Sequence, residues 1–202
     1  MNKTADAKSY RSFSDLANAQ VRGIDYEIIA VPRDSRVAVI APHGGAIEAG
    51  TSGIARAISC DDFSLYLFEG IKRSGNFRSL HLSSRYFDEP QCLNLIAKCE
   101  FVVAIHGCRG VDEKVLLGGL DAMLKGQIAD ALSDVGLAVE TEGHQFPAVD
   151  PNNICNRGAS HRGAQLELTS ALRRSASAAL VVSAVRSVLL PVHGAPHIGA
   201  VE

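Results

Sequence analysis

Two histidines that follow apolar strands are the residues of this sequence best suited to chemistry. His43 follows the apolar run 36–41, and His106 follows the run 101–105. In a parallel α/β sheet, ligands bind in the crevice beyond the carboxyl ends of the strands. The two imidazoles would therefore share one crevice if the two strands are neighbours. Glu48 comes five residues after His43, across a glycine pair that would let its carboxylate reach the same point.

Two histidines and one carboxylate leave a fourth ligand position open, which is the arrangement of catalytic zinc. A metal held there lowers the pKa of a water molecule to about 7 and polarises an amide carbonyl. The competing interpretation is that each histidine is an ordinary loop residue at a strand end, because the sequence alone does not bring them together. The same three ligands would also suit cobalt or nickel.

Glu167 is the next candidate, because it interrupts an apolar strand. The segment Ala164–Thr169 alternates, so Glu167 shares one face with Gln165 and Thr169 while two leucines occupy the other. A carboxylate in such a strand belongs either at an exposed sheet edge or in a site. In a site, it would act as a general base that takes a proton from water and passes it to the leaving amine. Both interpretations stay open at this stage.

Three arginines flank these candidates in the sequence. Arg157 lies in the glycine-flanked polar loop 152–158, Arg162 follows it, and Arg109 lies beside His106. A guanidinium suits bidentate recognition of a carboxylate. Each arginine alone is more often a solvated surface residue, but together they predict binding of an acidic substrate.

The elements that must position these residues are those of a single α/β domain, because short apolar runs alternate with helical patterns. Strands are expected at 26–31, 36–41, 64–68, 79–82, 101–105, 114–117, 137–140 and 164–169. Helices are expected at 51–60, 90–100, 120–132 and 170–190. The polar stretch 142–162 exceeds an ordinary connection, so it is either functional or mobile.

The whole chain of 202 residues is expected to form one catalytic domain, with flexible ends at 1–20 and 192–202. A formal net charge of -2 and the lack of a long basic run argue against a general nucleic-acid binder. No stretch is apolar enough for a membrane span, so no membrane partner is expected. The beginning of the chain lacks the apolar core of a signal peptide, which predicts a cytoplasmic protein.

Five segments resemble the poly-γ-glutamate hydrolase family, whose members occur in phages of bacilli and as phage-related proteins in bacterial genomes. They are APHGGAIEAGTS, LHLSSRYFDEP, AIHGCRG, GGLDAMLKGQIADAL and NICNRGASHRGAQLELTSALRR. The resemblance runs from about Tyr26 to Leu190, and its most specific parts are H-G-G-x-I-E and N-R-G…Q-L-E in this order. It implies a fold similar to the zinc carboxypeptidases, with a twisted mixed parallel and antiparallel sheet flanked by helices, and one zinc ion.

The resemblance also implies roles for particular residues. The implied zinc ligands are His43, Glu48 and His106, the implied general acid/base is Glu167, and the implied substrate-carboxylate clamp is Asn156 with Arg157. The spacing from the first histidine to its glutamate is wider than the H-x-x-E of true carboxypeptidases, so their substrates are not expected. The family pattern assigns no role to His161 or to the tail histidines His193 and His197.

The sequence therefore predicts a zinc-dependent hydrolase that cleaves the γ-glutamyl amide bonds of poly-γ-glutamate, a polyanion. Because the protein is itself net negative, it would need a local basic cleft to bind such a substrate. An alternative within the same chemistry is a small N-acyl amino acid such as an N-acylglutamate. A second alternative is a non-catalytic, prophage-derived metal-binding domain, although a decayed site would usually have lost a ligand. If the protein is phage-borne, cell lysis would release it.

Overall fold

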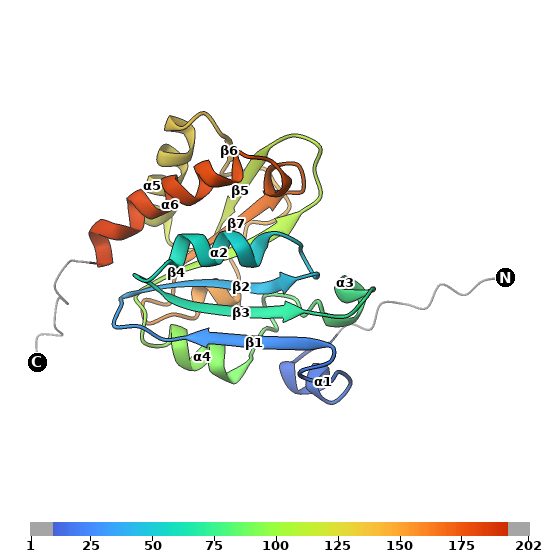
Figure 1. Cartoon of the computed structure of the whole chain (residues 1–202). Helices are drawn as coiled ribbons and strands as arrows, with labels where there is room; N and C mark the ends of the chain where they lie inside the picture. Colours follow the sequence, from blue (N-terminus) through green and yellow to red (C-terminus); the bar gives the residue numbers. More distant parts are fainter. Residues whose placement is uncertain (1–9, 194–202) are drawn as a thin grey trace, which may run out of the picture.

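The computed structural model describes residues 10–193, which form one seven-stranded mixed sheet flanked by helices (Figure 1). The strands are β1 (Tyr26–Val31), β2 (Val37–Gly45), β3 (Ser64–Gly70), β4 (Phe101–Cys108), β5 (Lys114–Gly118), β6 (Ala138–Glu140) and β7 (Ala164–Thr169). The α-helices are α1 (Phe13–Ala17), α2 (Thr51–Ser59), α3 (Asn76–Leu80), α4 (Pro90–Ile96), α5 (Ala122–Asp134) and α6 (Ala178–His193). Two short 3-10 helices, η1 (Ile154–Asn156) and η2 (Leu172–Arg174), flank β7 in the chain.

The sheet has the strand order β1-β3-β2-β4-β7-β5-β6. Its four central strands, β3, β2, β4 and β7, are parallel, whereas β1 and β5 run antiparallel to their inner neighbours. The mixed, helix-flanked α/β sheet expected from the sequence is confirmed. Because the carboxyl ends of the central strands meet at one edge, side chains that follow them are brought together there.

Helices cover both faces of the sheet, which explains why its central strands are apolar without interruption. On one face, alternate residues of β2 pack with α2, α5 and α6; on the other, the intervening residues pack with α1, α3 and α4 (Figure 1). Val39 and Ile40 illustrate the alternation, since they are neighbours in the chain and belong to opposite core clusters. A two-sided core of this kind holds the strand ends in fixed register.

The structure corrects two expected elements. Residues 79–82 do not form a strand; α3 ends at Leu80, and the following chain is irregular while Leu80 and Leu82 are both fully buried. The alternation of apolar and polar residues in 79–82 therefore comes from the last residue of a helix and one buried leucine after it. The helix expected at 170–190 is interrupted, because η2 comes first and α6 begins only at Ala178.

The ends of the chain differ in part from the expectation of flexibility. Residues 13–17 form α1, and Leu16 is fully buried in the core. At the other end, His193 is the last residue of α6. Residues 1–9 and 194–202, including His197, lie outside the described residues. Within residues 10–193, no helix is long and apolar enough to cross a membrane.

Candidate metal centre

His43 and His106 lie near the carboxyl ends of β2 and β4, which are neighbouring strands, so the two histidines can share one site. β2 pairs with β4 in parallel as far as Ile40 and Ala104, and the register of β2 against β3 shifts between Ala41 and Gly44, the interval that contains His43. In β4, His106 pairs directly with Glu167 of β7. The register therefore places both histidines and the glutamate along one edge of the sheet.

A tight turn after His43 brings Glu48 back over the same edge. The backbone N–H of Glu48 donates to the carbonyl of His43 across 3.0 Å. Gly45 makes the turn possible, because its φ of 61° lies in the left-handed region and a Cβ there would stand 2.5 Å from the carbonyl oxygen of Gly70. The glycine pair that the sequence offered as a flexible connection is thus the end of β2, paired with β3, and the turn begins there.

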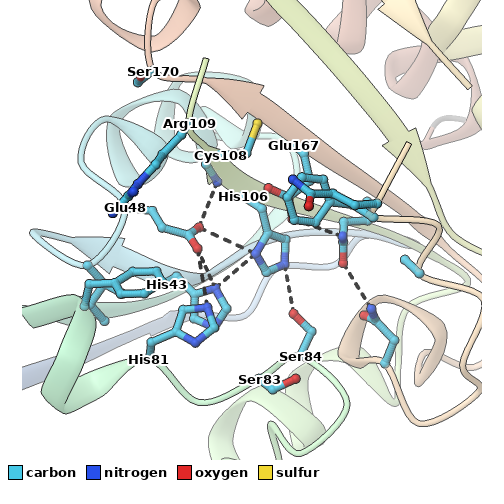
Figure 2. Close-up of a pocket in the computed structure, with 18 of the residues that line it drawn as sticks. His43, Glu48, His81, Ser83, Ser84, His106, Cys108, Arg109, Glu167 and Ser170 are labelled. Carbon is cyan, nitrogen blue, oxygen red and sulfur yellow. Dashed lines mark hydrogen bonds and ion pairs between the residues drawn. The ribbon is translucent and has the colours of Figure 1, made fainter. Parts of the chain in front are cut away.

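His43, Glu48 and His106 form one buried cluster in which a ligand atom of each lies within 4.8 Å of the others (Figure 2). The Nδ1 atoms of the two histidines are 3.1 Å apart. Glu48 Oε1 lies 3.1 Å from Nδ1 of His43, and Glu48 Oε2 lies 3.6 Å from Nδ1 of His106. The expectation that these three side chains converge is met by the geometry.

The outer atoms of the cluster are held by the protein. His43 Nε2 donates to the carbonyl of Leu82 across 2.7 Å, because a carbonyl only accepts. When the ring is neutral, as metal binding requires, Nδ1 therefore presents its lone pair to the cluster. His106 Nε2 lies 3.3 Å from the hydroxyl of Ser84. Such partners on the far nitrogen are typical of metal-binding histidines, whose tautomer they fix.

The donor set fits a divalent cation such as zinc. Nδ1 of His43 faces Nδ1 of His106 and the carboxylate of Glu48 at close range, so three atoms that can bind a metal converge on one point. Two nitrogens and one oxygen are ligands that zinc accepts, with further positions left for water or substrate. The residues present therefore suit the metal that the family resemblance implies.

Electrostatics keep Glu48 ionised. Burial alone would raise the pKa of Glu48, but without a bound metal the charge of protonated His43 and hydrogen bonds from His106, His43 and His81 hold it well below its ordinary value. The backbone N–H of Gly107 also donates to Glu48 Oε2 across 2.8 Å. For His106, burial opposes protonation, yet contact with Glu48 and the charge of Glu167 raise its pKa.

Glu167 lies in the interior of the sheet, so the exposed-edge interpretation is wrong. Its strand β7 runs between β4 and β5, and only 6 % of the residue is exposed. Burial raises the pKa of Glu167 from about 4.5 to about 7. Gln165 Nε2 donates to Glu167 Oε1 across 3.2 Å, and Asn153 in turn donates to Gln165 across 3.0 Å. A carboxyl that titrates near neutrality beside the cluster is well suited to move a proton.

The cluster opens into a pocket of about 1100 Å³. Both polar and apolar residues line it, and the long stretch 142–162 supplies part of its wall. The cationic side chains that line it are Arg85, Arg109, Arg173 and Arg174. The anionic side chains that line it are Glu48, Asp150 and Glu167. With two of these carboxylates at the cluster itself, the remaining surface is basic on balance.

Of the arginines expected to bind substrate, the structure brings only Arg109 to the pocket, where it is exposed. Arg157 and Arg162 are absent from the described residues that line the pocket. Arg157 instead donates to the carbonyl of Phe87 across 3.3 Å. Arg162 has a side chain that is 58 % exposed, and its Nε lies 3.5 Å from a carboxylate oxygen of Asp121. Neither matches the expected substrate clamp.

Asn156 does not match the expected substrate clamp either, because both ends of its side-chain amide are hydrogen-bonded to backbone groups of the protein. Its Oδ1 accepts from the backbone N–H groups of Leu120 and Gly163. Its Nδ2 donates to the carbonyls of Ala148 and Asp150. Asn156 is 1 % exposed, so it holds the pocket wall in shape rather than facing substrate.

Several ionisable residues that line the pocket were not predicted from the sequence, among them His81, Arg173 and Arg174. The ring of His81 stacks on that of His43 with centroids 4.0 Å apart, and its Nε2 lies 3.6 Å from Glu48. The segments LHLSSRY and TSALRR carried these residues, but both were interpreted as regular elements. By contrast, His161 is exposed and does not appear among the described residues that line the pocket.

A buried centre of two histidines and a carboxylate, beside a protonatable glutamate at the carboxyl edge of an α/β sheet, is of the kind found in metallohydrolases. The chain belongs to the poly-gamma-glutamate hydrolase family, whose sequence model matches residues 10–186.

Named relatives come from Bacillus subtilis strain 168. The chain is 35 % identical to the UPF0714 protein YndL over 168 residues, which are 82 % of this chain and 66 % of YndL. It is 35 % identical to the SPbeta prophage-derived UPF0714 protein YoqZ over 175 residues, which are 86 % of this chain and 63 % of YoqZ. The chain thus spans about two thirds of the length of these relatives.

Two solved structures share the fold closely. A bacteriophage poly-gamma-glutamate hydrolase superposes with a TM-score of 0.86 at 32 % identity. The zinc-free apo form of YNDL superposes with a TM-score of 0.83 at 30 % identity. Each match covers 90 % of this chain and 96 % of the other.

Proposed function

We propose that this chain is a zinc-dependent hydrolase that cleaves the γ-glutamyl amide bonds of poly-γ-glutamate. The observation that carries the proposal is the convergence of His43, Glu48 and His106 beside Glu167 in one arginine-lined pocket. Membership of the family and the likeness to a phage poly-gamma-glutamate hydrolase support the substrate. The similar structure of YNDL is a zinc-free apo form, which supports zinc as the metal.

His43, Glu48 and His106 would hold the ion. When bound, zinc acts as a Lewis acid on an amide carbonyl and makes water a nucleophile near neutral pH. The far nitrogens of both rings are already engaged by Leu82 and Ser84, so the inward nitrogens are fixed in direction before any ion arrives.

Glu167 would move the proton. In hydrolysis, the oxygen of water bonds to the amide carbon, the carbon–nitrogen bond breaks, and one proton passes from water to the departing amine. A carboxyl with a pKa of about 7 is present in both forms at neutral pH, so it can take that proton and give it up again. Gln165 holds one of its oxygens and thereby fixes its orientation.

The exposed guanidinium groups of Arg109 and Arg174 would bind the substrate. Poly-γ-glutamate carries one free α-carboxylate on each residue, and arginine pairs with carboxylates through two parallel hydrogen bonds. The pocket volume of about 1100 Å³ slightly exceeds that of a typical small-molecule site, which favours several residues of a polymer over one N-acyl amino acid.

The test is a metal analysis and a polymer-cleavage assay, before and after chelation, on the wild type and on Glu167→Gln. We expect one zinc per chain, loss of cleavage with chelator, and recovery when zinc is returned. Glu167→Gln should keep its zinc and lose activity by about 10²–10⁴-fold. Cleavage of an N-acylglutamate but not of the polymer would replace the proposed substrate. No stoichiometric metal, even when zinc is offered, would overturn the site.

A further inference from the structure

Arg173 lies beside the metal cluster, but its guanidinium points at the backbone of three different segments. Its Nε donates to the carbonyl of Leu168 across 3.0 Å, and its Nη2 donates to the carbonyl of Cys108 across 3.1 Å. Its Nη1 donates to the carbonyl of Ala49. All three nitrogens of the Arg173 guanidinium therefore donate hydrogen bonds to backbone carbonyls of the protein.

Each of these carbonyls adjoins a residue of the site. Ala49 follows Glu48, Leu168 follows Glu167, and Cys108 comes two residues after His106. One planar group thus ties the turn after β2 to the ends of β4 and β7. A rigid fork of five N–H donors can hold three carbonyls at once, whereas a lysine ammonium cannot reproduce that geometry.

Gly107 leaves the space that this arrangement needs. A Cβ at Gly107 would stand 2.7 Å from Nε and 2.8 Å from Nη1 of Arg173, closer than real contacts allow. Gly107 also donates its N–H to Glu48. The glycine that follows His106 therefore lets the guanidinium lie flat against the strand that carries a metal ligand.

We propose that Arg173 is a positioning residue that fixes Glu48, His106 and Glu167 relative to one another by joining the three backbone segments that carry them. The proposal rests on the proposed zinc site. It separates Arg173 from the exposed Arg109 and Arg174, whose guanidinium groups remain available for substrate carboxylates.

The experiment compares the affinity of the metal-free proteins for Zn²⁺, measured by competition with a chromophoric chelator. For Arg173→Ala we expect zinc affinity to fall by about 10–100-fold, as for other groups that orient metal ligands. Arg173→Lys should not restore it, although the charge is kept. The matched control is Arg186→Ala, which removes another arginine that joins segments, through the carbonyl of Ile58 and the carboxylate of Asp62, away from the site. Its zinc affinity should equal that of the wild type.

A second variant keeps the proposal testable if Arg173→Ala unfolds. Gly107→Ala, made alone, should displace the guanidinium and weaken zinc binding. Where Arg173→Ala does fold, adding Gly107→Ala to it should cost little more, because both changes remove the same contacts. Unchanged zinc affinity in Arg173→Ala, with only KM raised, would overturn the positioning role in favour of substrate binding. Full rescue by Arg173→Lys would also overturn it. Failure of the wild type to bind zinc would overturn the proposed function, and the positioning role with it.

Discussion

At the scale of single residues, the behaviour of the site depends on which side chains are free to lose or gain a proton. Two buried carboxyls lie near each other, yet contacts hold the pKa of Glu48 well below its ordinary value while burial raises that of Glu167 to about 7. The roles proposed for them, metal ligand and proton carrier, would therefore follow from their surroundings, since both are glutamates. Environments that push two carboxyl pKa values apart are how enzymes assign such roles.

The raised pKa of Glu167 has a measurable effect on stability. Between about pH 4.5 and 7 the folded protein holds a proton that the unfolded chain has released, so the free energy of unfolding falls as the pH rises through this window. Glu167→Gln does not titrate. We expect the metal-free variant to gain about 1–3 kcal/mol of stability relative to the wild type between pH 5 and pH 8. Urea unfolding of both proteins at these two pH values measures the gain. A difference that stays constant with pH would contradict the raised pKa.

At the scale of elements, the turn after β2 decides whether Glu48 reaches the histidines. Gly45 has a left-handed φ of 61° and lies against the backbone of Gly70 in β3, so a side chain there is both strained and crowded. The turn therefore depends on a residue whose only contribution is the lack of a Cβ.

We expect Gly45→Ala to lower the free energy of unfolding by about 1–3 kcal/mol and to weaken zinc binding. The matched control is Gly126→Ala in α5, where the added Cβ meets no atom within 4 Å. In a helix interior that change should raise stability by about 0.5–1 kcal/mol. Chemical denaturation of both variants provides the measurement. If both variants gain stability alike, the turn tolerates a Cβ and the crowding argument fails.

The strands and the proposed metal ligands could be predicted because apolar runs recur along the chain and mark where each strand lies. Apolar runs predicted all seven strands, and the two histidines follow two of these runs in the sequence. The strands β2 and β4 extend beyond the runs and include His43 and His106. His81 and Arg173 were not predicted, because each lies just after or within a short helical turn where no periodic pattern marks its direction. The substrate role expected for Asn156 came from the family resemblance, and that of Arg157 came both from its glycine-flanked loop and from the resemblance. Sequence could not show that their side chains turn toward backbone carbonyls.

At the scale of the whole molecule, a formal net charge of -2 gives a polyanion no long-range attraction. Attraction must come from the pocket arginines, whose fields are screened beyond about 10 Å at 0.1 M salt and about 3 Å at 1 M. We expect KM for poly-γ-glutamate to rise with salt while kcat changes little. The double variant Arg109→Gln, Arg174→Gln should start with a higher KM and show a weaker salt dependence. A KM that falls with salt would show that the substrate carboxylates do not bind to these arginines.

A stack of three aromatic rings leads from the protein surface to the metal cluster, so a fluorescent residue at its outer end could report on binding in the pocket. Phe77 is 57 % exposed and stacks on His81 with centroids 4.6 Å apart, and His81 stacks in turn on His43. The chain contains no tryptophan. Phe77→Trp would therefore introduce the one tryptophan of the chain. Only the ring of His81 would lie between its indole and His43, a proposed metal ligand. The emission of the indole would follow the arrival of a metal or a polymer in real time, with no label attached.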